Sequence, residues 1–299
     1  MTISKNYGTA LNLVLQKAAG LAACLVLVFA VAGCRSVPEY RCDQFPESIE
    51  TPPETVAVFY TPGASELLVF GDCALARERF IPCSTFKIVS TLMGLDSGAV
   101  SGKSARLGYD GQKHEYEAWN RDVTLQEAFQ ASCVWYYKKL VGKLDKSYVQ
   151  RTLDRLHYGN ADISVWNRNG HNVFWIESSL LISPEEQVAV LADIFSGGAG
   201  FRPEHVAILR NCMDAGTVGD FRMYGKTGTG RNHNTNFLES WYVGFVEIPG
   251  KDRVFFAIHS ADPKRNVTSA SLRETIAALI RQLGPILQKY AGNLPENGS

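Results

Sequence analysis

The chain of 299 residues has an ordinary globular composition, with 45% hydrophobic residues, 20% charged residues and a formal net charge of zero. This length is enough for one large domain or two interlocked ones, with a sizeable hydrophobic core. The balanced charge gives no reason to expect a nucleic-acid partner or a polyanionic substrate.

The N-terminus has the pattern of a targeting segment. Lys5 and Lys17 supply positive charge, and an uncharged run over residues 18–33, rich in Ala, Leu and Val, is too short for a comfortable membrane span. The run leads into a Val-Ala-Gly-Cys sequence that ends at Cys34 and is similar to a bacterial lipobox, in which the cysteine becomes lipidated.

We therefore expect residues 1–33 to be a lipoprotein signal peptide and Cys34 to carry a lipid anchor. Residues 34–50 would form a tether, residues 51–292 the folded domain and residues 293–299 a flexible tail. The expected location is the periplasm of a bacterium, on the outer membrane. The alternatives are an uncleaved anchor, or an ordinary signal in which Cys34 is incidental.

Seven cysteines are present, and five remain once Cys24 and Cys34 are set aside. Five is an odd number, so at least one of them stays unpaired or pairs between chains. An exported chain can form disulfides. Cys42 and Cys73 both lie in the N-terminal region and are the pair that we expect.

Cys83 and Cys133 lie next to two serines that belong to sequence motifs described below, and we expect them to be small buried hydrophobic residues. The six histidines show no HxH or HExxH spacing, and none lies in a cysteine cluster. The sequence therefore predicts no metal site.

Two strands and a helix are predicted after the tether. Residues 56–60 and 67–70 are apolar runs, and a Thr-Pro-Gly-Ala turn at 61–64 separates them. Apolar residues then recur at helical spacing over residues 88–95, and Gly98 ends this helix.

The middle of the chain, roughly residues 98–200, is predicted to be mostly helical. Thr124 and Glu127 form a capping-box pattern, as do Ser183 and Glu186. The second box has a proline at the first helical position, which favours a helix start at that point.

Three strand-like runs follow at residues 222–226, 241–246 and 254–259, and a final amphipathic helix has its apolar positions between residues 272 and 283. Strands at both ends with helices between them predict an α+β fold. We expect an antiparallel sheet built from both termini and flanked by helices, with a mostly helical inserted subdomain.

The most informative motif is Ser-Thr-Phe-Lys, which places Ser84 and Lys87 three residues apart at the start of the predicted helix. Residues at this spacing share one helical face, so the hydroxyl and the amine can converge. A lysine held neutral in an apolar pocket can take the proton of a serine nucleophile. In isolation, the same pattern would be a helix cap beside a solvated lysine.

Four further motifs follow in order: Ser-Cys-Val at 132–134, Tyr-Gly-Asn at 158–160, Trp-Ile at 175–176 and Lys-Thr-Gly at 226–228. With the Ser-x-x-Lys motif, this set resembles the penicillin-recognising serine enzymes, and in detail the class D β-lactamases. The resemblance runs from about Pro82 to the last helix and implies a β-lactamase/DD-transpeptidase-like fold.

The resemblance implies that Ser84 attacks the β-lactam carbonyl and that Lys87 takes up CO2, derived from bicarbonate, to form an N6-carboxylysine. This carbamate would be the general base for acylation and deacylation. Trp175 would donate its indole N–H to the carbamate, and Val134 replaces an asparagine that is frequent in related enzymes. The expected carbamate pocket consists of Phe86, Val134, Trp175 and Ile176.

The resemblance also implies that Ser132 delivers a proton to the lactam nitrogen and that Lys226 holds Ser132 and the substrate carboxylate electrostatically. The backbone N–H groups of Ser84 and Thr229 would form the oxyanion hole. The expected substrate-binding residues are Thr227, Gly228, Thr229 and Arg273.

Each of these substrate-binding residues has an expected role. Thr227 would hydrogen-bond the substrate carboxylate, and Gly228 would let the substrate lie against the strand without a Cβ clash. Arg273 would bind the same carboxylate bidentately, with Lys264 and Arg265 as alternatives.

These observations predict a class D β-lactamase that hydrolyses β-lactam antibiotics, attached to a membrane through Cys34 and needing no metal or organic cofactor. One alternative is a β-lactam sensor that stays acylated, although such sensors need a multi-helix membrane region and the sequence has one short apolar segment. Another is a penicillin-binding DD-peptidase, which usually has asparagine in place of Val134. A degenerate binding lipoprotein is a third.

Overall fold

The computed structural model describes residues 39–52, 54–167, 172–176, 179–232, 236–264 and 266–292. The predicted signal peptide, the lipidation site Cys34, the tail 293–299 and the alternative cation Arg265 lie outside these residues. Within the described ranges, no helix is both long and apolar enough to cross a membrane.

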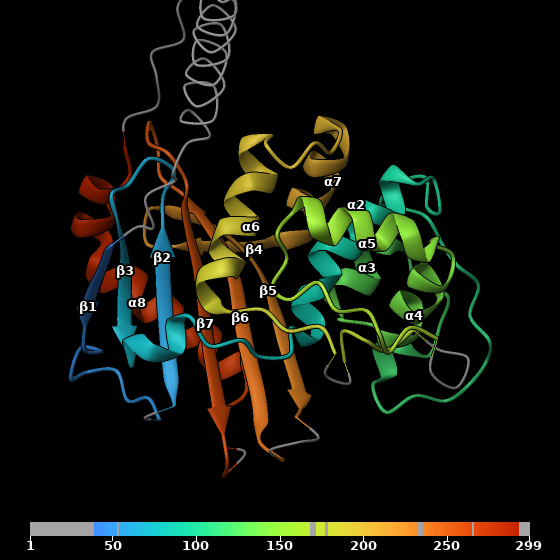
Figure 1. The fold of residues 1–299 in the computed structure, drawn as a ribbon, viewed down its shortest axis with the longest axis horizontal. Helices are drawn as coiled ribbons and strands as arrows, with labels where there is room; N and C mark the ends of the chain where they lie inside the picture. Colours follow the sequence, from blue (N-terminus) through green and yellow to red (C-terminus); the bar gives the residue numbers. More distant parts are fainter. Residues whose placement is uncertain are drawn as a thin grey trace, which may run out of the picture. The chain divides into compact units, whose positions relative to one another are not determined.

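A seven-stranded sheet lies at the centre of the described chain, in the order β1-β3-β2-β7-β6-β5-β4 (Figure 1). The N-terminal and C-terminal strands meet where β2 pairs antiparallel with β7, which confirms a sheet built from both ends. The strands are β1 (Glu39–Asp43), β2 (Thr55–Tyr60), β3 (Glu66–Gly71), β4 (Asp214–Val218), β5 (Phe221–Arg231), β6 (Leu238–Glu247) and β7 (Val254–Asp262).

The sheet departs from the prediction at its two edges. β3 inserts between β1 and β2, so it lies antiparallel to β2 but parallel to β1. The sequence analysis missed β1 and β4, because both are short and largely exposed and so lack an apolar pattern. The predicted tether 34–50 therefore includes a strand of the sheet.

The central strands are buried on both faces, which explains their nearly continuous apolar sequences. In β2, Val56 and Val58 face one hydrophobic cluster, whereas Ala57 and Phe59 face the other. Because side chains alternate along a strand, each central strand contributes to two cores at once.

Helices cover both faces of the sheet (Figure 1). The long C-terminal helix packs on β5, β6 and β7 from one side, while α6 packs on β2 and β7 from the other. The helices are α2 (Lys87–Asp96), α3 (Leu125–Gln130), α4 (Val134–Gly142), α5 (Lys146–Arg155), α6 (Pro184–Ser196), α7 (Pro203–Met213) and α8 (Ser269–Tyr290), with short 3-10 turns η2 (Cys73–Ala76), η3 (Cys83–Phe86) and η4 (Glu117–Trp119).

The helical part of the molecule differs in extent from the predicted subdomain at 98–200. α2 contacts α4 and α7, and α3 contacts α7, so the helical group continues to residue 213. α6 lies on the sheet instead. Both predicted capping boxes are present, at Thr124 with Glu127 and at Ser183 with Glu186. Such caps typically contribute about 1 kcal/mol each.

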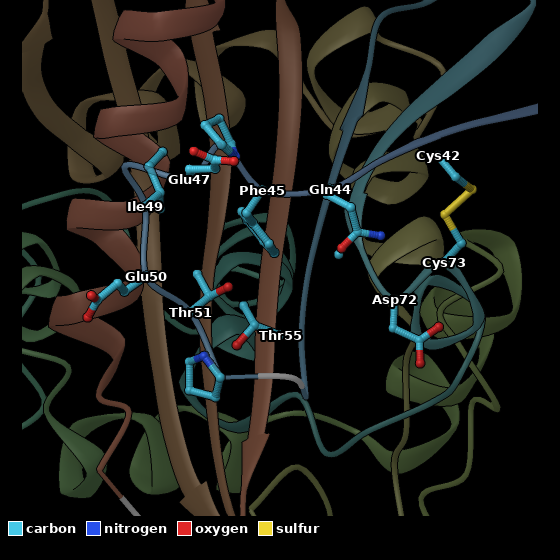
Figure 2. Close-up of a pocket in the computed structure, with 13 residues that line it drawn as sticks. Cys42, Gln44, Phe45, Glu47, Ile49, Glu50, Thr51, Thr55, Asp72 and Cys73 are labelled. Atoms are coloured by element: carbon cyan, nitrogen blue, oxygen red, sulfur yellow. A yellow bond between two sulfur atoms is a disulfide. The ribbon is translucent and has the colours of Figure 1, made fainter.

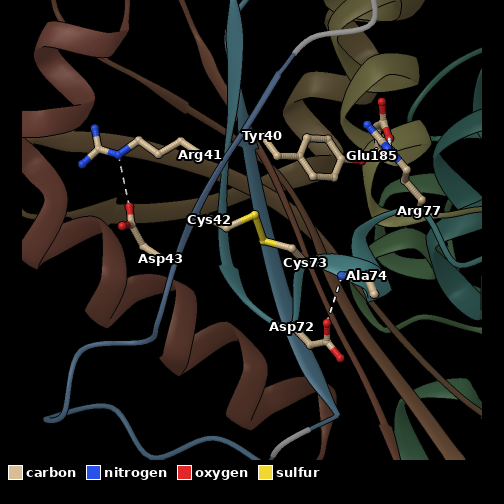
Figure 3. Close-up of a disulfide and its surroundings, with 9 residues drawn as sticks. All are labelled: Tyr40, Arg41, Cys42, Asp43, Asp72, Cys73, Ala74, Arg77 and Glu185. Carbon is tan, nitrogen blue, oxygen red and sulfur yellow. Dashed lines mark hydrogen bonds and ion pairs between the residues drawn. A yellow bond between two sulfur atoms is a disulfide. The ribbon is translucent and has the colours of Figure 1, made fainter.

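The predicted disulfide between Cys42 and Cys73 is present and ties β1 to the turn after β3 (Figure 3). On one side of β1, Tyr40 donates a hydrogen bond to the Glu185 carboxylate at the start of α6. The Arg77 guanidinium lies 4.2 Å from the centroid of the Tyr40 ring and donates to its hydroxyl oxygen. The edge strand is therefore fixed both covalently and by these polar contacts.

A pocket of about 890 Å³ lies beside this disulfide (Figure 2). Segment 44–52 forms one wall, with Phe45 and Ile49 among its apolar side chains and Glu47 and Glu50 among its acidic ones. The pocket contains none of the motif residues, so its size does not make it the active site.

Replacing both bridge cysteines, as Cys42→Ser/Cys73→Ser, is expected to lower the free energy of unfolding by about 2–4 kcal/mol, because the bridge joins residues 31 apart and restricts the unfolded chain. Urea unfolding of the parent and the variant measures this difference. Reductant should lower the urea concentration at which half of the parent is unfolded and leave that concentration unchanged for the variant. Equal midpoints for the oxidised parent and the variant would contradict the prediction.

Candidate active site

Ser84 lies in the 3-10 turn η3, immediately before α2 begins at Lys87. The turn is fixed from within, because Thr85 donates to the Pro82 carbonyl through both its backbone N–H and its hydroxyl. Lys87 Nζ and Ser84 Oγ are hydrogen-bonded at 2.6 Å. The predicted convergence of the amine and the hydroxyl is therefore observed.

Lys87 is fully buried. Burial, together with the nearby positive charge of Lys226, lowers the pKa of Lys87 well below its usual range. Its Nζ lies 4.9 Å from the ring centroid of Trp175 and 5.3 Å from that of Tyr137. This environment favours the neutral amine, the form that can accept a proton from Ser84.

Aromatic side chains form the wall beside Lys87. Phe86 stacks on Trp175 and contacts Tyr158 and Phe174 edge to face. The indole N–H of Trp175 is buried and has no hydrogen-bond partner among the described residues. An unpaired buried donor is costly, so an acceptor placed next to Lys87 within reach of this group would be stabilised by it. Val134 and Ile176 are half-buried and pack against the same core.

Ser132 lies in the turn between α3 and α4, with its φ angle at 54° in the left-handed region. Lys226 Nζ donates to Ser132 Oγ at 3.0 Å and to the Thr227 carbonyl at 3.0 Å. Burial lowers the pKa of Lys226 to about 7. The pair can therefore hold or release a proton near neutral pH, next to Ser84 and Lys87.

The Lys-Thr-Gly motif lies on a strand edge that faces the site. β4 pairs with β5 only as far as Tyr224, whereas β6 pairs with β5 as far as Arg231. The backbone from Gly225 onward is therefore paired on one side only in the described structure. The Thr229 N–H belongs to this segment, as the predicted oxyanion hole requires.

Two glycines on this strand lie where a side chain would meet neighbouring residues of the protein. A Cβ on Gly228 would lie 3.0–3.2 Å from Thr85 and the Pro82 carbonyl, and one on Gly230 would lie 2.6 Å from Cys83 Sγ. We predicted that Gly228 makes room for substrate. The structure shows that it makes room for the turn that carries Ser84, and the room for substrate stays a prediction.

The predicted anion-binding residues share one pocket of about 310 Å³. Lys226, Thr227 and Arg273 line it together with the half-buried Ala215 on β4. Arg273 is exposed in the second turn of α8 and donates to the Ala215 carbonyl at 2.9 Å. Two cationic side chains and a hydroxyl are the groups that would bind a carboxylate.

The structure gives roles to residues that the sequence analysis left without one. Trp119 donates its indole N–H to the Ala131 carbonyl at 2.9 Å, next to Ser132. Asn160 hydrogen-bonds the Leu181 backbone in both directions, which gives the Tyr-Gly-Asn motif a structural role. The sequence does not predict this contact of Trp119, because a single tryptophan usually belongs to the core.

Cys83 and Cys133 are free and buried, as predicted. Burial raises the pKa of Cys83 well above its usual range and that of Cys133 to about 11, so both thiols are protonated at neutral pH. Within the described ranges, no group of three or more His, Cys, Asp or Glu side chains is arranged to hold a metal ion.

Comparisons with known proteins agree with this geometry. The family model described as the penicillin-binding protein transpeptidase domain matches residues 72–281. The chain is 34% identical to the β-lactamase OXA-20 of Pseudomonas aeruginosa, over 69% of this chain and 73% of that protein. It is 30% identical to the regulatory protein BlaR1 of Bacillus licheniformis, over 68% of this chain and 33% of that protein.

A solved structure is also similar. FUS-1 (OXA-85), a class D β-lactamase from Fusobacterium nucleatum subsp. polymorphum, superposes with a TM-score of 0.69 at 29% identity. The match covers 78% of this chain and 93% of that chain.

Gly230→Ala is expected to lower the free energy of unfolding by about 1–3 kcal/mol, because the new methyl group would overlap Cys83 Sγ. Adding Cys83→Ala should restore much of that loss, since it removes the overlapping atom. Thermal or urea unfolding of the two single variants and the double variant measures the coupling. Additive losses would show that the two side chains are not in contact.

Proposed function

Because the chain belongs to the penicillin-recognising serine enzymes, in the branch that contains the class D β-lactamases and the BlaR penicillin receptors, we propose that it hydrolyses β-lactam antibiotics through an acyl-enzyme on Ser84. The observation that carries the proposal is the contact between the fully buried Lys87 amine and the Ser84 hydroxyl. A neutral lysine at this distance can activate the hydroxyl as a nucleophile.

The first step is attack of Ser84 Oγ on the lactam carbonyl as its proton passes to Lys87. The carbonyl oxygen gains negative charge, which the backbone N–H groups of Ser84 and Thr229 would stabilise. The lactam C–N bond then breaks, and the nitrogen takes a proton from Ser132 while Lys226 reprotonates Ser132. The Lys226–Ser132 hydrogen bond supports this assignment.

The substrate carboxylate would bind in the pocket lined by Lys226, Thr227 and Arg273. Arg273 now donates to the Ala215 carbonyl, so its guanidinium already lies at this pocket. Electrostatic attraction would then orient the lactam ring towards Ser84.

We further propose that Lys87 is carboxylated by CO2. The neutral amine is the form that reacts with CO2, and the unpaired indole N–H of Trp175 fits a new acceptor beside it. Phe86, Val134 and Ile176 would exclude water from the carbamate. When present, this group supplies a general base that also activates the water for deacylation.

Residues 1–34 also belong to the proposal. We propose export to the periplasm and lipid anchoring at Cys34, on the sequence pattern described above. Labelling with a radioactive fatty acid in the parent, but not in Cys34→Ala, would support the anchor.

The similarity to BlaR1 makes a penicillin receptor the second candidate function. The two functions differ in the fate of the acyl-enzyme. Mixing the purified chain with a chromogenic cephalosporin, with intact-mass analysis of the product, measures that fate. Sustained turnover supports a hydrolase, whereas one stoichiometric burst with a persistent adduct supports the receptor. Ser84→Ala should abolish both signals, and Lys87→Ala should acylate poorly and hardly turn over.

Trp175→Phe keeps the aromatic ring beside Lys87 but removes the indole N–H. Turnover is expected to fall by about tenfold or more, in line with the loss of a hydrogen bond to a charged group, and added bicarbonate should restore part of it. Trp166→Phe is the matched control, because Trp166 stacks on Phe174 in the same aromatic cluster. A bicarbonate-independent rate in Trp175→Phe would argue against the carbamate.

A further inference from the structure

A buried carboxylate and an indole bind the backbone N–H and C=O of Ile81, three residues before Ser84. Glu239 Oε2 accepts a hydrogen bond from the Ile81 N–H at 3.0 Å, and Trp241 Nε1 donates to the Ile81 carbonyl at 2.9 Å. Glu239 and Trp241 are two residues apart on β6, so both side chains point to the same face of the sheet. One strand therefore binds both backbone polar groups of the same residue.

Burial of the Glu239 carboxylate at this position is unfavourable for stability. It is 1% exposed, and burial raises its pKa to about 7 although hydrogen bonds from Asn232 and Ile81 oppose that rise. The nearby titratable groups are His259 on β7, with Nε2 3.9 Å from the Glu239 carboxylate, and Glu78 and Cys83 on the segment that leads to Ser84.

His259 does not neutralise the carboxylate. It is fully buried and stacks on Phe80, with ring centroids 3.8 Å apart, and burial lowers its pKa well below the usual range. Its distance from Glu239 is too long for a hydrogen bond. Among the residues that the structure describes, Glu239 has no cationic partner, and a buried carboxylate in that situation is unfavourable for stability. Its polar contacts therefore require another explanation.

The same carboxylate also binds the segment that follows β5, the strand on the other side of the active site. Asn232, which follows the last residue of β5, donates to Glu239 Oε1. Gly230 on β5 is the register partner of Glu239 on β6, and it is also the residue that Cys83 Sγ approaches. Glu239 therefore binds the segment before Ser84 with one oxygen and the segment after Thr229 with the other.

The segment before Ser84 needs such support. Cys83 has a φ of 51°, in the left-handed region that side-chain-bearing residues rarely adopt. A residue in this region keeps its conformation only when the surrounding contacts impose it. The Ile81 contacts lie on the N-terminal side of Cys83, where they can oppose relaxation of the turn that presents Ser84.

We infer that Glu239 is a positioning residue that sets the separation between the two backbone donors of the oxyanion hole, the N–H groups of Ser84 and Thr229. The inference rests on the proposed function, since it assumes that both donors act on a β-lactam carbonyl. A carboxylate suits the position because each of its two oxygens is an acceptor, one for the segment before Ser84 and one for the segment after Thr229.

The test compares Glu239→Ala and Glu239→Gln with Glu247→Ala as the matched control. Glu247 lies at the opposite end of β6, where its half-buried carboxylate binds Arg210 and Arg253. The measurement is acylation by a fluorescent penicillin, quenched over time and resolved by gel. Its dependence on penicillin concentration gives the acylation rate constant and the apparent affinity separately, whether or not the acyl-enzyme is later hydrolysed.

Glu239→Ala is expected to lower the acylation rate constant by about 10- to 100-fold, as misplacement of reacting groups does, while the apparent affinity changes little. Glu239→Gln keeps an acceptor for the Ile81 N–H but loses the acceptor for Asn232, so it should recover only part of the rate. Glu247→Ala should acylate at the parent rate even if it is equally destabilised. A purely structural role would not separate the rate constant from affinity in this way.

Two results would overturn the inference alone: parent-like acylation by Glu239→Ala, or equal losses in Glu239→Ala and Glu247→Ala. If Glu239→Ala does not fold, Trp241→Phe tests the same geometry, because it removes the donor to the Ile81 carbonyl and keeps the ring bulk. Parent-like acylation by a folded Trp241→Phe would then overturn the inference. If the parent chain does not acylate at all, the proposed function fails and the inference fails with it.

Discussion

The burial of one amine is the constraint on which the active site depends. Lys87 begins helix α2 beneath aromatic side chains, where a charged ammonium is disfavoured. Burial therefore favours the neutral amine, which is hydrogen-bonded to Ser84, the residue it would activate. The positive charge of Lys226 across the site acts in the same direction. Stability and reactivity are therefore coupled at this position, as is usual where a side chain has a strongly shifted pKa.

The second constraint is the close approach of strand β5 to η3, the turn that carries Ser84. Gly228 and Gly230 lie where a Cβ would meet the residues before and after Ser84. This approach leaves the edge of β5 beyond Tyr224 paired on one side only, as a substrate-binding strand requires. Contacts from β6 to Ile81 then hold the turn from the opposite side. The site is thus built by two parts of the chain that are far apart in sequence, the turn that carries Ser84 and the adjacent strands β5 and β6.

Several structural features that the sequence predicts are present. Ser84 and Lys87 converge because residues three apart share one face of a helical turn. The disulfide between Cys42 and Cys73 and both capping boxes are also present. The prediction was less complete for β1, β4 and α7, which have short or weakly apolar patterns. The extent of the helical part depends on the packing of α6 on the sheet and of α7 on α2, which is not encoded in local periodicity.

The sequence by itself determined the family, the order of the motifs and the strands that are apolar throughout, because these follow from residue type and spacing. Only the tertiary structure decided which groups are desolvated. The low pKa of Lys226, the unpaired indole N–H of Trp175 and the buried carboxylate of Glu239 all depend on neighbours from other elements. Glu239 has no signal of its own in the sequence, since a glutamate on a strand is usually exposed. Its environment results from long-range pairing, because β6 places it under a segment more than 150 residues away.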